Sequence, residues 1–275
     1  LSGWILHSMG SIAGLRGWQW LFILEGLPSV LLGLVVLAWL DDRVADAKWL
    51  DDEERAYLQS RLDAESVGKH GHSVLDSIRN PYVWMLAATN FGVAMGVYGI
   101  AFWLPTILHN EAFRDLRVLG IVTMIPWLVA AVVMVWVGRS ADQRGERRWH
   151  VAAPSLVGAA GLALSVALAA HPYLATLMLT IATAGVVAAF PQVFRIAAKL
   201  WDGSAAATSL AIVGSVGNLS GFVSPYMVGL LKVKTGSTES GIYGIAVVIL
   251  IAVVLVLSIR PGLVNDAPAG KQVVV

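Results

Sequence analysis

The sequence contains no cysteine and few charged residues. Charged residues make up 13% of the 275 positions and hydrophobic residues 57%, whereas a soluble domain carries about 25% charged residues. A soluble fold with so little charge would expose large apolar patches, and the mean hydropathy of +0.72 excludes disorder. Without cysteine, neither a disulfide framework nor a thiolate metal site can form. The net charge of +1 gives no reason to expect a nucleic-acid partner.

Patterns typical of catalysis or cofactor binding are also absent from the sequence. No two of the six histidines have the spacing of a metal-ligand pair, so we expect no metal site. The phosphate-binding pattern Gly-x-x-x-x-Gly-Lys-Ser/Thr does not occur, and we expect no cofactor. No apolar segment combines paired carboxylates, or serine with histidine. The sequence therefore gives poor support to an intramembrane enzyme, and we do not expect the chain to be an enzyme.

The sequence does contain long uncharged segments. Of its 19 basic and 18 acidic residues, 16 lie between Asp41 and Arg79 and six between Arg139 and Arg148. About 20 mostly apolar residues cross the hydrocarbon core of a bilayer as a helix. The uncharged segments therefore predict an all-α membrane protein with seven spans: Trp18–Leu40, Pro81–Leu108, Val118–Val137, Val151–Ala170, Leu174–Ala198, Ala205–Leu231 and Ile242–Ile259.

Lysine and arginine are distributed unevenly over the loops between these spans. Under the predicted topology, 14 of the 19 basic residues fall on one side of the membrane and five on the other. Basic residues concentrate in cytoplasmic loops. We therefore expect the polar segment Asp41–Arg79 and the C-terminus to face the cytoplasm.

The polar segment Asp41–Arg79 is expected to contain a short helix. Asp51 and Glu54 have the spacing of a capping box, and Leu58 and Leu62, one turn apart, give that helix one apolar edge. We interpret the segment as a solvated connector between two helical bundles. A partner-binding element is the alternative.

Small residues recur at four-residue spacing inside two of the spans. Gly92 and Gly96 form one pair, and Gly217 and Gly221 form another. Such pairs let helix backbones approach closely. They suit helices that rock against their neighbours, although static packing in a bundle explains any single pair equally well.

The most specific segment is the predicted turn Gly138–Arg148, between the third and fourth spans. We expect Gly138 to open the turn, Asp142 to close the preceding helix and Gly145 to reverse the chain. The Asp142 carboxylate can pair with nearby guanidinium groups or with a helix N-terminus. We interpret the segment as a charge lock at the membrane face, with a simple basic anchor as the alternative. The residues assigned to this conformational switch are Gly138, Asp142, Arg144, Gly145, Arg147 and Arg148.

This segment resembles the cytoplasmic-loop motif of the major facilitator superfamily, which runs Gly, three residues, Asp, Arg, one residue, Gly, one residue, Arg, Arg. The sequence departs from the motif at Gln143, where the family usually has arginine. Further segments resemble helices of the anion:cation symporter branch, which includes tartrate, phthalate, 4-hydroxyphenylacetate and sugar-acid permeases. Arg16–Pro28 is similar to its sixth helix, Tyr98–Pro105 to its seventh and Gly217–Tyr226 to its eleventh.

The resemblance implies a twelve-helix fold of two six-helix halves around a central cavity, of which this chain is the C-terminal portion. Residues 1–40 would be the end of the first half, with Leu1–Met9 as the tail of helix five and the following span as helix six. Helices one to four and most of five would be absent. Residues 41–79 would form a cytoplasmic interdomain loop, residues 80–260 the second six-helix half, and residues 261–275 a cytoplasmic tail.

Polar side chains inside apolar spans are costly to bury, so each is a candidate for contact with a substrate. Asn90 and Tyr98 lie eight residues apart, near one face of one helix. Asn218 lies in the middle of a later span, beside two glycines. A phenol or a carboxamide can donate a hydrogen bond to a carboxylate without the cost of burying a full charge. The alternative for each residue is a hydrogen bond between helices.

Two further candidates lie in the fifth predicted span. Arg195 could pair with an anion, or its long side chain could reach the membrane surface. Gln192 is a weaker candidate. The substrate-binding residues expected from the sequence are therefore Asn90, Tyr98, Asn218, Arg195 and Gln192.

The resemblance implies a secondary active transporter of a small organic carboxylate such as tartrate, phthalate or a sugar acid. Transport would proceed by alternating access, in symport with a proton. The expected partners are the organic anion, the proton and the lipid bilayer, and the expected form is a monomer in a bacterial inner membrane. The alternative is a truncated, non-transporting membrane fragment or scaffold.

Overall fold

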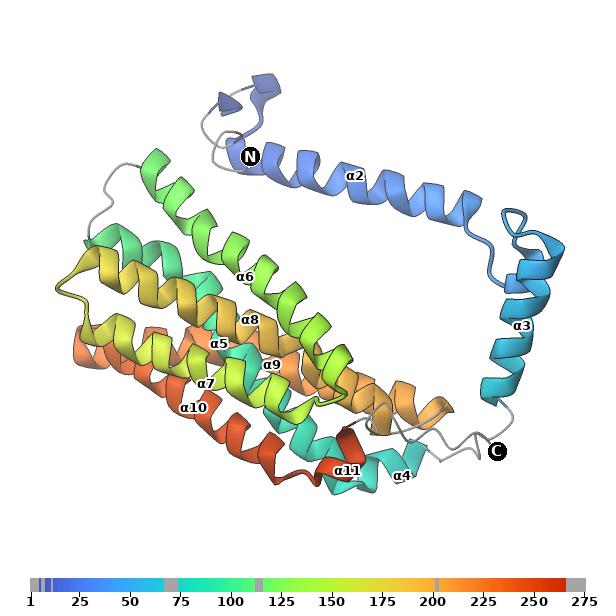
Figure 1. Ribbon diagram of the computed structural model, residues 1–275. Helices are drawn as coiled ribbons and strands as arrows, with labels where there is room; N and C mark the ends of the chain where they lie inside the picture. Colours follow the sequence, from blue (N-terminus) through green and yellow to red (C-terminus); the bar gives the residue numbers. More distant parts are fainter. Residues whose placement is uncertain are drawn as a thin grey trace. The chain divides into compact units, whose positions relative to one another are not determined.

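Helices make up all the regular secondary structure in the part of the computed structural model that can be described, which is residues 5, 8–10, 12–66, 74–111, 116–200 and 203–265. Most of Leu1–Met9, the predicted tail of an earlier helix, lies outside these residues. Within them, seven helices are long and apolar enough to cross a membrane, one for each predicted span. They are α2 (Gly17–Trp39), α5 (Pro81–Glu111), α6 (Leu116–Arg144), α7 (Arg148–Ala167), α8 (Pro172–Leu200), α9 (Gly203–Thr235) and α10 (Glu239–Ser258) (Figure 1). The predicted all-α membrane fold is confirmed.

The chain divides into two compact units, Leu1–Lys69 and His70–Val275. The first unit holds η1 (Ile12–Gly14), α2, η2 (Val44–Asp46) and α3 (Asp52–Ser66). The predicted capping box is present at the start of α3. The Glu54 N–H donates to Asp51 Oδ1 at 2.7 Å, and the Asp51 N–H donates to Glu54 Oε2 at 3.4 Å. The sequence therefore located the start of this helix correctly.

The second unit begins within the segment that the sequence interprets as one connector. Helix α4 (Val74–Arg79) belongs to this unit, and Ser77 Oγ donates to the Ala205 carbonyl oxygen of α9 at 3.2 Å. The second unit also contains α5 to α10 and the short α11 (Pro261–Val264).

Helices α5 and α8 form the centre of the second unit. In these helices 61% and 56% of the membrane-crossing window is buried, compared with 17% in α6 and 22% in α9. Helix α5 packs against α8, α9 and α10, whereas α8 packs against α6 and α7 as well as α5. Helices α6 and α9 therefore each leave a broad face uncovered by the rest of this unit.

Glycine allows the central helices to pack closely. A Cβ atom at Gly92 of α5 would lie 2.7 Å from Ala252 Cβ on α10, and one at Gly96 would lie 2.8 Å from Val186 Cγ1 on α8. A Cβ atom at Gly158 of α7 would lie 2.6 Å from Val186 Cγ2. Side-chain atoms are normally separated by more than 3.4 Å, so these positions require glycine. The predicted role of the Gly92–Gly96 pair in close packing is confirmed.

Candidate functional site

Two of the predicted substrate-binding residues meet between α5 and α9. The Tyr98 hydroxyl donates to Asn218 Oδ1 at 3.2 Å, and the Tyr98 ring lies against Gly221, where a Cβ atom would be 3.4 Å from the ring. Asn218 is exposed and Tyr98 is partly buried. Since Tyr98 uses the oxygen of the Asn218 carboxamide, the Nδ2 group keeps its N–H donors for another acceptor. The pair therefore presents uncharged donors on an uncovered face of the unit.

Asn90 lies instead inside the seam between α5 and α9. Its side chain is 1% exposed, and its Nδ2 donates to the Val213 carbonyl oxygen at 3.0 Å. The Asn90 carboxamide lies directly against Gly217, and a Cβ atom at Gly217 would collide with it. In this arrangement Asn90 joins two helices and does not reach the face that carries Tyr98 and Asn218.

Gln192 occupies a comparable position between α8 and α6. Its side chain is 1% exposed, and its Oε1 is buried with no hydrogen-bond partner among the described residues. A Cβ atom at Gly138 of α6 would lie 3.6 Å from Gln192 Nε2. Gly138 and the Gln192 carboxamide are therefore neighbours across the α6–α8 interface, with space for an ordinary van der Waals contact between them.

The predicted role of Gly138 in opening a turn is wrong. Helix α6 continues without interruption through Arg144, because polar residues at the end of a membrane helix remain helical when their side chains can reach water or partners. The reversal occurs at Gly145, whose φ of +62° lies in the left-handed region that favours glycine. The α6–α7 turn, defined here as residues 145–147, is therefore much shorter than the sequence predicts.

Arg195 of α8 joins the switch residues and not the Tyr98–Asn218 pair. Its Nη1 is bonded to Asp142 Oδ1 in the last turn of α6, and Arg147 Nη1 lies 3.5 Å from the same oxygen. The side chains of Arg195 and Asp142 are 45% and 48% exposed, whereas that of Arg147 is 16% exposed. Asp142 thus links α8 to the α6–α7 turn through two guanidinium groups. Arg144, the last residue of α6, is exposed.

Sequence reasoning missed a cluster of four polar residues on the other side of this turn. The Glu146 carboxylate accepts from the Trp149 N–H at 2.8 Å and lies 3.2 Å from His150 Nδ1. The other ring nitrogen of His150 lies 3.0 Å from Ser140 Oγ, and Asn265 donates to Glu146 at 3.1 Å. An acidic residue just before a helix N-terminus is favourable, and this position could have indicated Glu146. Nothing local in the sequence could have indicated Asn265.

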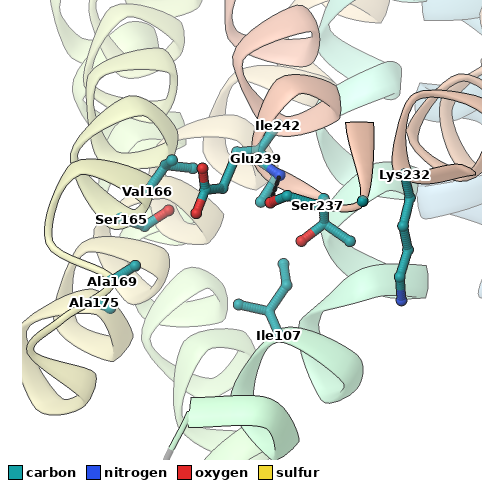
Figure 2. A pocket seen from close by; sticks show the side chains of 11 residues that line it. Ile107, Ser165, Val166, Ala169, Ala175, Lys232, Ser237, Glu239 and Ile242 are labelled. Carbon is teal, nitrogen blue, oxygen red and sulfur yellow. Dashed lines mark hydrogen bonds between the residues drawn. The ribbon is translucent and has the colours of Figure 1, made fainter. Parts of the chain in front are cut away.

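A cavity lies at the opposite end of the second unit, where α9 turns into α10. Its volume is about 190 Å³, and its lining includes Ser165, Lys232 and Glu239. Figure 2 shows the Glu239 carboxylate directed towards Ser165 and the Lys232 ammonium directed away from it. Lys232 Nζ lies 5.3 Å from the centre of the Trp103 ring. The residues that line this cavity include none of the five predicted substrate-binding residues, so it is separate from the Tyr98–Asn218 pair.

Comparisons with known proteins agree with the resemblance found in the sequence. Residues 1–225 match the family model described as Major Facilitator Superfamily. "Putative metabolite transport protein NicT" of Pseudomonas putida is 35% identical over 96% of this chain and 61% of its own length. A "Putative tartrate transporter" of Agrobacterium vitis is 38% identical over 92% of this chain and 56% of its own length. Inner membrane transport protein RhmT of Escherichia coli is 33% identical over 94% of this chain and 60% of its own length. The chain therefore spans between 56% and 61% of the length of these relatives.

Proposed function

Because the chain belongs to the Major Facilitator Superfamily, we propose that it forms part of a secondary active transporter of a small organic anion. The substrate class is a carboxylate such as tartrate, phthalate or a sugar acid. Transport proceeds by alternating access and is coupled to the symport of a proton. The chain is a multi-pass membrane protein, since seven of its described helices can cross a bilayer.

The observation that carries the substrate class is the Tyr98–Asn218 pair. In this pair the Asn218 carboxamide, held by the Tyr98 hydroxyl, offers uncharged N–H donors on an uncovered helix face. Such donors suit a carboxylate, because hydrogen bonds to an ionised acceptor contribute about 1.5–3 kcal/mol. They also avoid placing a full charge among apolar helices, which is costly in a membrane. The name of the tartrate transporter relative supports the same class. Arg195, Gln192 and Asn90 are weaker candidates, because each is engaged or buried between helices.

The contacts around Asp142 support the proposed conformational switch. An exposed ion pair such as that of Asp142 with Arg195 contributes about 0–1 kcal/mol. A contact this weak can bias a conformational equilibrium and still open during each transport cycle. The proposed switch keeps the six residues assigned to it from the sequence and adds Arg195 of α8, which is bonded to Asp142. The six residues are Gly138, Asp142, Arg144, Gly145, Arg147 and Arg148.

The proposed topology follows from the basic residues, of which 14 lie on one side and five on the other. It puts the α6–α7 turn and the C-terminus on the cytoplasmic side of the membrane. The proposed membrane is a bacterial inner membrane. Residues 41–79 then form the cytoplasmic connector and residues 80–260 the second helical half of a monomer.

Uptake into proteoliposomes tests the proposal directly. The full-length protein is reconstituted, and initial uptake of radiolabelled tartrate, phthalate and a sugar acid is measured with and without an inward proton gradient. We expect uptake of at least one acid, abolished by a protonophore. Uptake that is independent of every ion gradient would contradict symport, and no uptake of any organic acid would contradict the substrate class.

A non-transporting membrane fragment is the second candidate, because the chain spans only 56–61% of the length of its relatives. The same assay distinguishes the two. Residues 1–275 expressed alone would insert into the membrane but fail to transport, whereas the full-length protein would transport. A full-length protein no longer than this chain would favour the fragment.

A further inference from the structure

The first turn of α7 is capped by a residue from a distant part of the sequence. The first N–H groups of a helix have no acceptor within it, and the side chain of Arg147, the N-cap residue of α7, provides none. Asn265 Oδ1 accepts from the Arg147 N–H at 3.0 Å and lies 3.5 Å from the Arg148 nitrogen. Asparagine is among the best N-cap residues, and here it acts on a helix that begins 117 residues before it.

Both ends of the Asn265 carboxamide are used. While Oδ1 accepts from the backbone of α7, Nδ2 donates to Glu146 Oε1 at 3.1 Å. Glu146 in turn accepts from the Trp149 N–H. The N–H groups of Arg147, Arg148 and Trp149 at the start of α7 are therefore satisfied by Asn265 and Glu146 together. The side chain that joins these two groups needs both a donor and an acceptor, which a carboxamide has.

Helix α7 in turn provides a side chain that caps the C-terminal end of α10. Arg148 Nη1 donates to the carbonyl oxygen of Ile259 at 2.6 Å, and Ile259 is the C-cap residue of α10. Ile259 and Val264 are both 0% exposed, so these bonds lie next to a packed apolar surface. The segment comprising α11 and Asn265 therefore fastens the α6–α7 turn to the end of α10.

The two sides of the turn differ in how firmly they are held. On one side, Asp142 meets Arg195 through side chains that are nearly half exposed, and water weakens such a contact. On the other side, Asn265 and Arg148 bond to backbone groups of partly buried helix ends, where an unsatisfied group is costly. The Asp142–Arg195 contact is therefore the one that can open while the turn stays attached to α7 and α10.

We propose that Asn265 is a positioning residue for the switch. By capping α7, it holds the α6–α7 turn where Asp142 reaches both Arg147 and Arg195. The proposal rests on the proposed role of Asp142 in transport, but the cap itself can be measured without transport.

Hydrogen–deuterium exchange of the full-length protein in detergent tests the cap. In Asn265→Ala, the peptide covering residues 146–152 is expected to exchange about ten-fold faster, as loss of an N-cap implies. Ser258→Ala is the matched control, because Ser258 Oγ donates to the Val254 carbonyl oxygen within α10 itself. It should leave exchange in this peptide unchanged. Unaltered exchange in Asn265→Ala would overturn the proposal.

A swap of amide and carboxylate tests the link to Glu146. Asn265→Asp keeps the acceptor for the α7 backbone but faces Glu146 with a second carboxylate, so we expect exchange intermediate between the native protein and Asn265→Ala. Adding Glu146→Gln restores one donor and one acceptor, and exchange should return towards the native rate. A double variant that exchanges as fast as Asn265→Asp alone would contradict the reciprocal bond.

Uptake kinetics test the positioning role. Asn265→Ala and Asp142→Asn should each lower the maximal uptake rate and leave KM unchanged. If Asn265 acts through Asp142, the double variant should be no slower than Asp142→Asn. Multiplicative losses would show that Asn265 acts by another route and would overturn the positioning role. Unchanged uptake in Asp142→Asn would overturn both the switch and the positioning role, while the exchange data would still report on the cap.

Discussion

The Arg195 guanidinium of α8 is bonded to the Asp142 carboxylate of α6, a residue 53 positions away in the sequence. From the sequence alone, Arg195 is a candidate to pair with an anionic substrate, with a side chain that reaches the membrane surface as the alternative. The structure gives it an anionic partner within the chain, at the end of the bundle where the α6–α7 turn lies. This pairing changes the kinetic effect that we expect from substitution of Arg195.

Arg195→Gln should lower the maximal uptake rate by about two- to five-fold and leave KM within a factor of two. The reason is that an exposed ion pair contributes up to about 1 kcal/mol to one conformation, and its loss shifts the conformational equilibrium without touching the substrate. Initial-rate uptake over a range of substrate concentrations measures both constants. A large rise in KM at unchanged maximal rate would instead assign Arg195 to the substrate site.

Asn218→Ala should raise KM about ten- to 150-fold, because it removes N–H donors whose hydrogen bonds to an ionised carboxylate contribute about 1.5–3 kcal/mol. Tyr98→Phe should have a smaller effect, since the Tyr98 hydroxyl orients the Asn218 carboxamide and does not supply those donors. The measurement is competition of unlabelled acid against radiolabelled uptake. Val254→Ala, at a 64% exposed position of α10, is the control. Equal KM values in Asn218→Ala and the control would rule out this site.

Gly217→Ala should destabilise the second unit by about 1–3 kcal/mol, the usual cost of overpacking, because its methyl group would collide with the Asn90 carboxamide. Thermal unfolding in detergent measures the loss as a lower Tm. Gly120→Ala is the matched control, since a Cβ atom at this glycine of α6 meets nothing within 4 Å.

Adding Asn90→Ala to Gly217→Ala should recover part of the lost stability, because it removes the group that the new methyl would strike. A Gly217→Ala protein with native Tm would show that α5 and α9 are not as tightly joined as this structure implies.

Single cysteines introduced into the second unit test the proposed orientation. The chain contains no native cysteine, so it contributes no background labelling. Gln143→Cys, beside the α6–α7 turn, should be protected from a membrane-impermeant maleimide in intact cells, whereas Thr235→Cys, at the end of α9, should react. Both positions are exposed. The reverse pattern would invert the topology.

The membrane helices could be predicted from the sequence because an uncharged apolar segment of about 20 residues is typical of a membrane-spanning helix. Their ends could not be predicted equally well. The span expected to end at Val137 continues as helix to Arg144, since hydropathy reports where the bilayer ends and not where backbone hydrogen bonding ends. Local capping signals predict helix ends more accurately, as Asp51 and Glu54 show at the start of α3.

The candidate site was less predictable because it depends on how each helix is rotated. Asn90 and Tyr98 lie eight residues apart, which corresponds to a rotation of about 80° around an α-helix. That difference lets Asn90 face Val213 while Tyr98 reaches Asn218. The sequence identified both residues as polar groups in one span, but only packing against α9 determines which one stays accessible.

Glycine contacts at the centre of the second unit also limit how it can deform. Where α5 meets α10 at Gly92, and where α7 meets α8 at Gly158, an added Cβ atom would lie 2.7 Å or less from a side-chain atom of the facing helix. These interfaces have no slack, and packed interiors respond to load by displacement as a block and not by compression. A displacement of one of these helices would therefore carry its glycine-packed partner with it, α10 with α5 and α8 with α7.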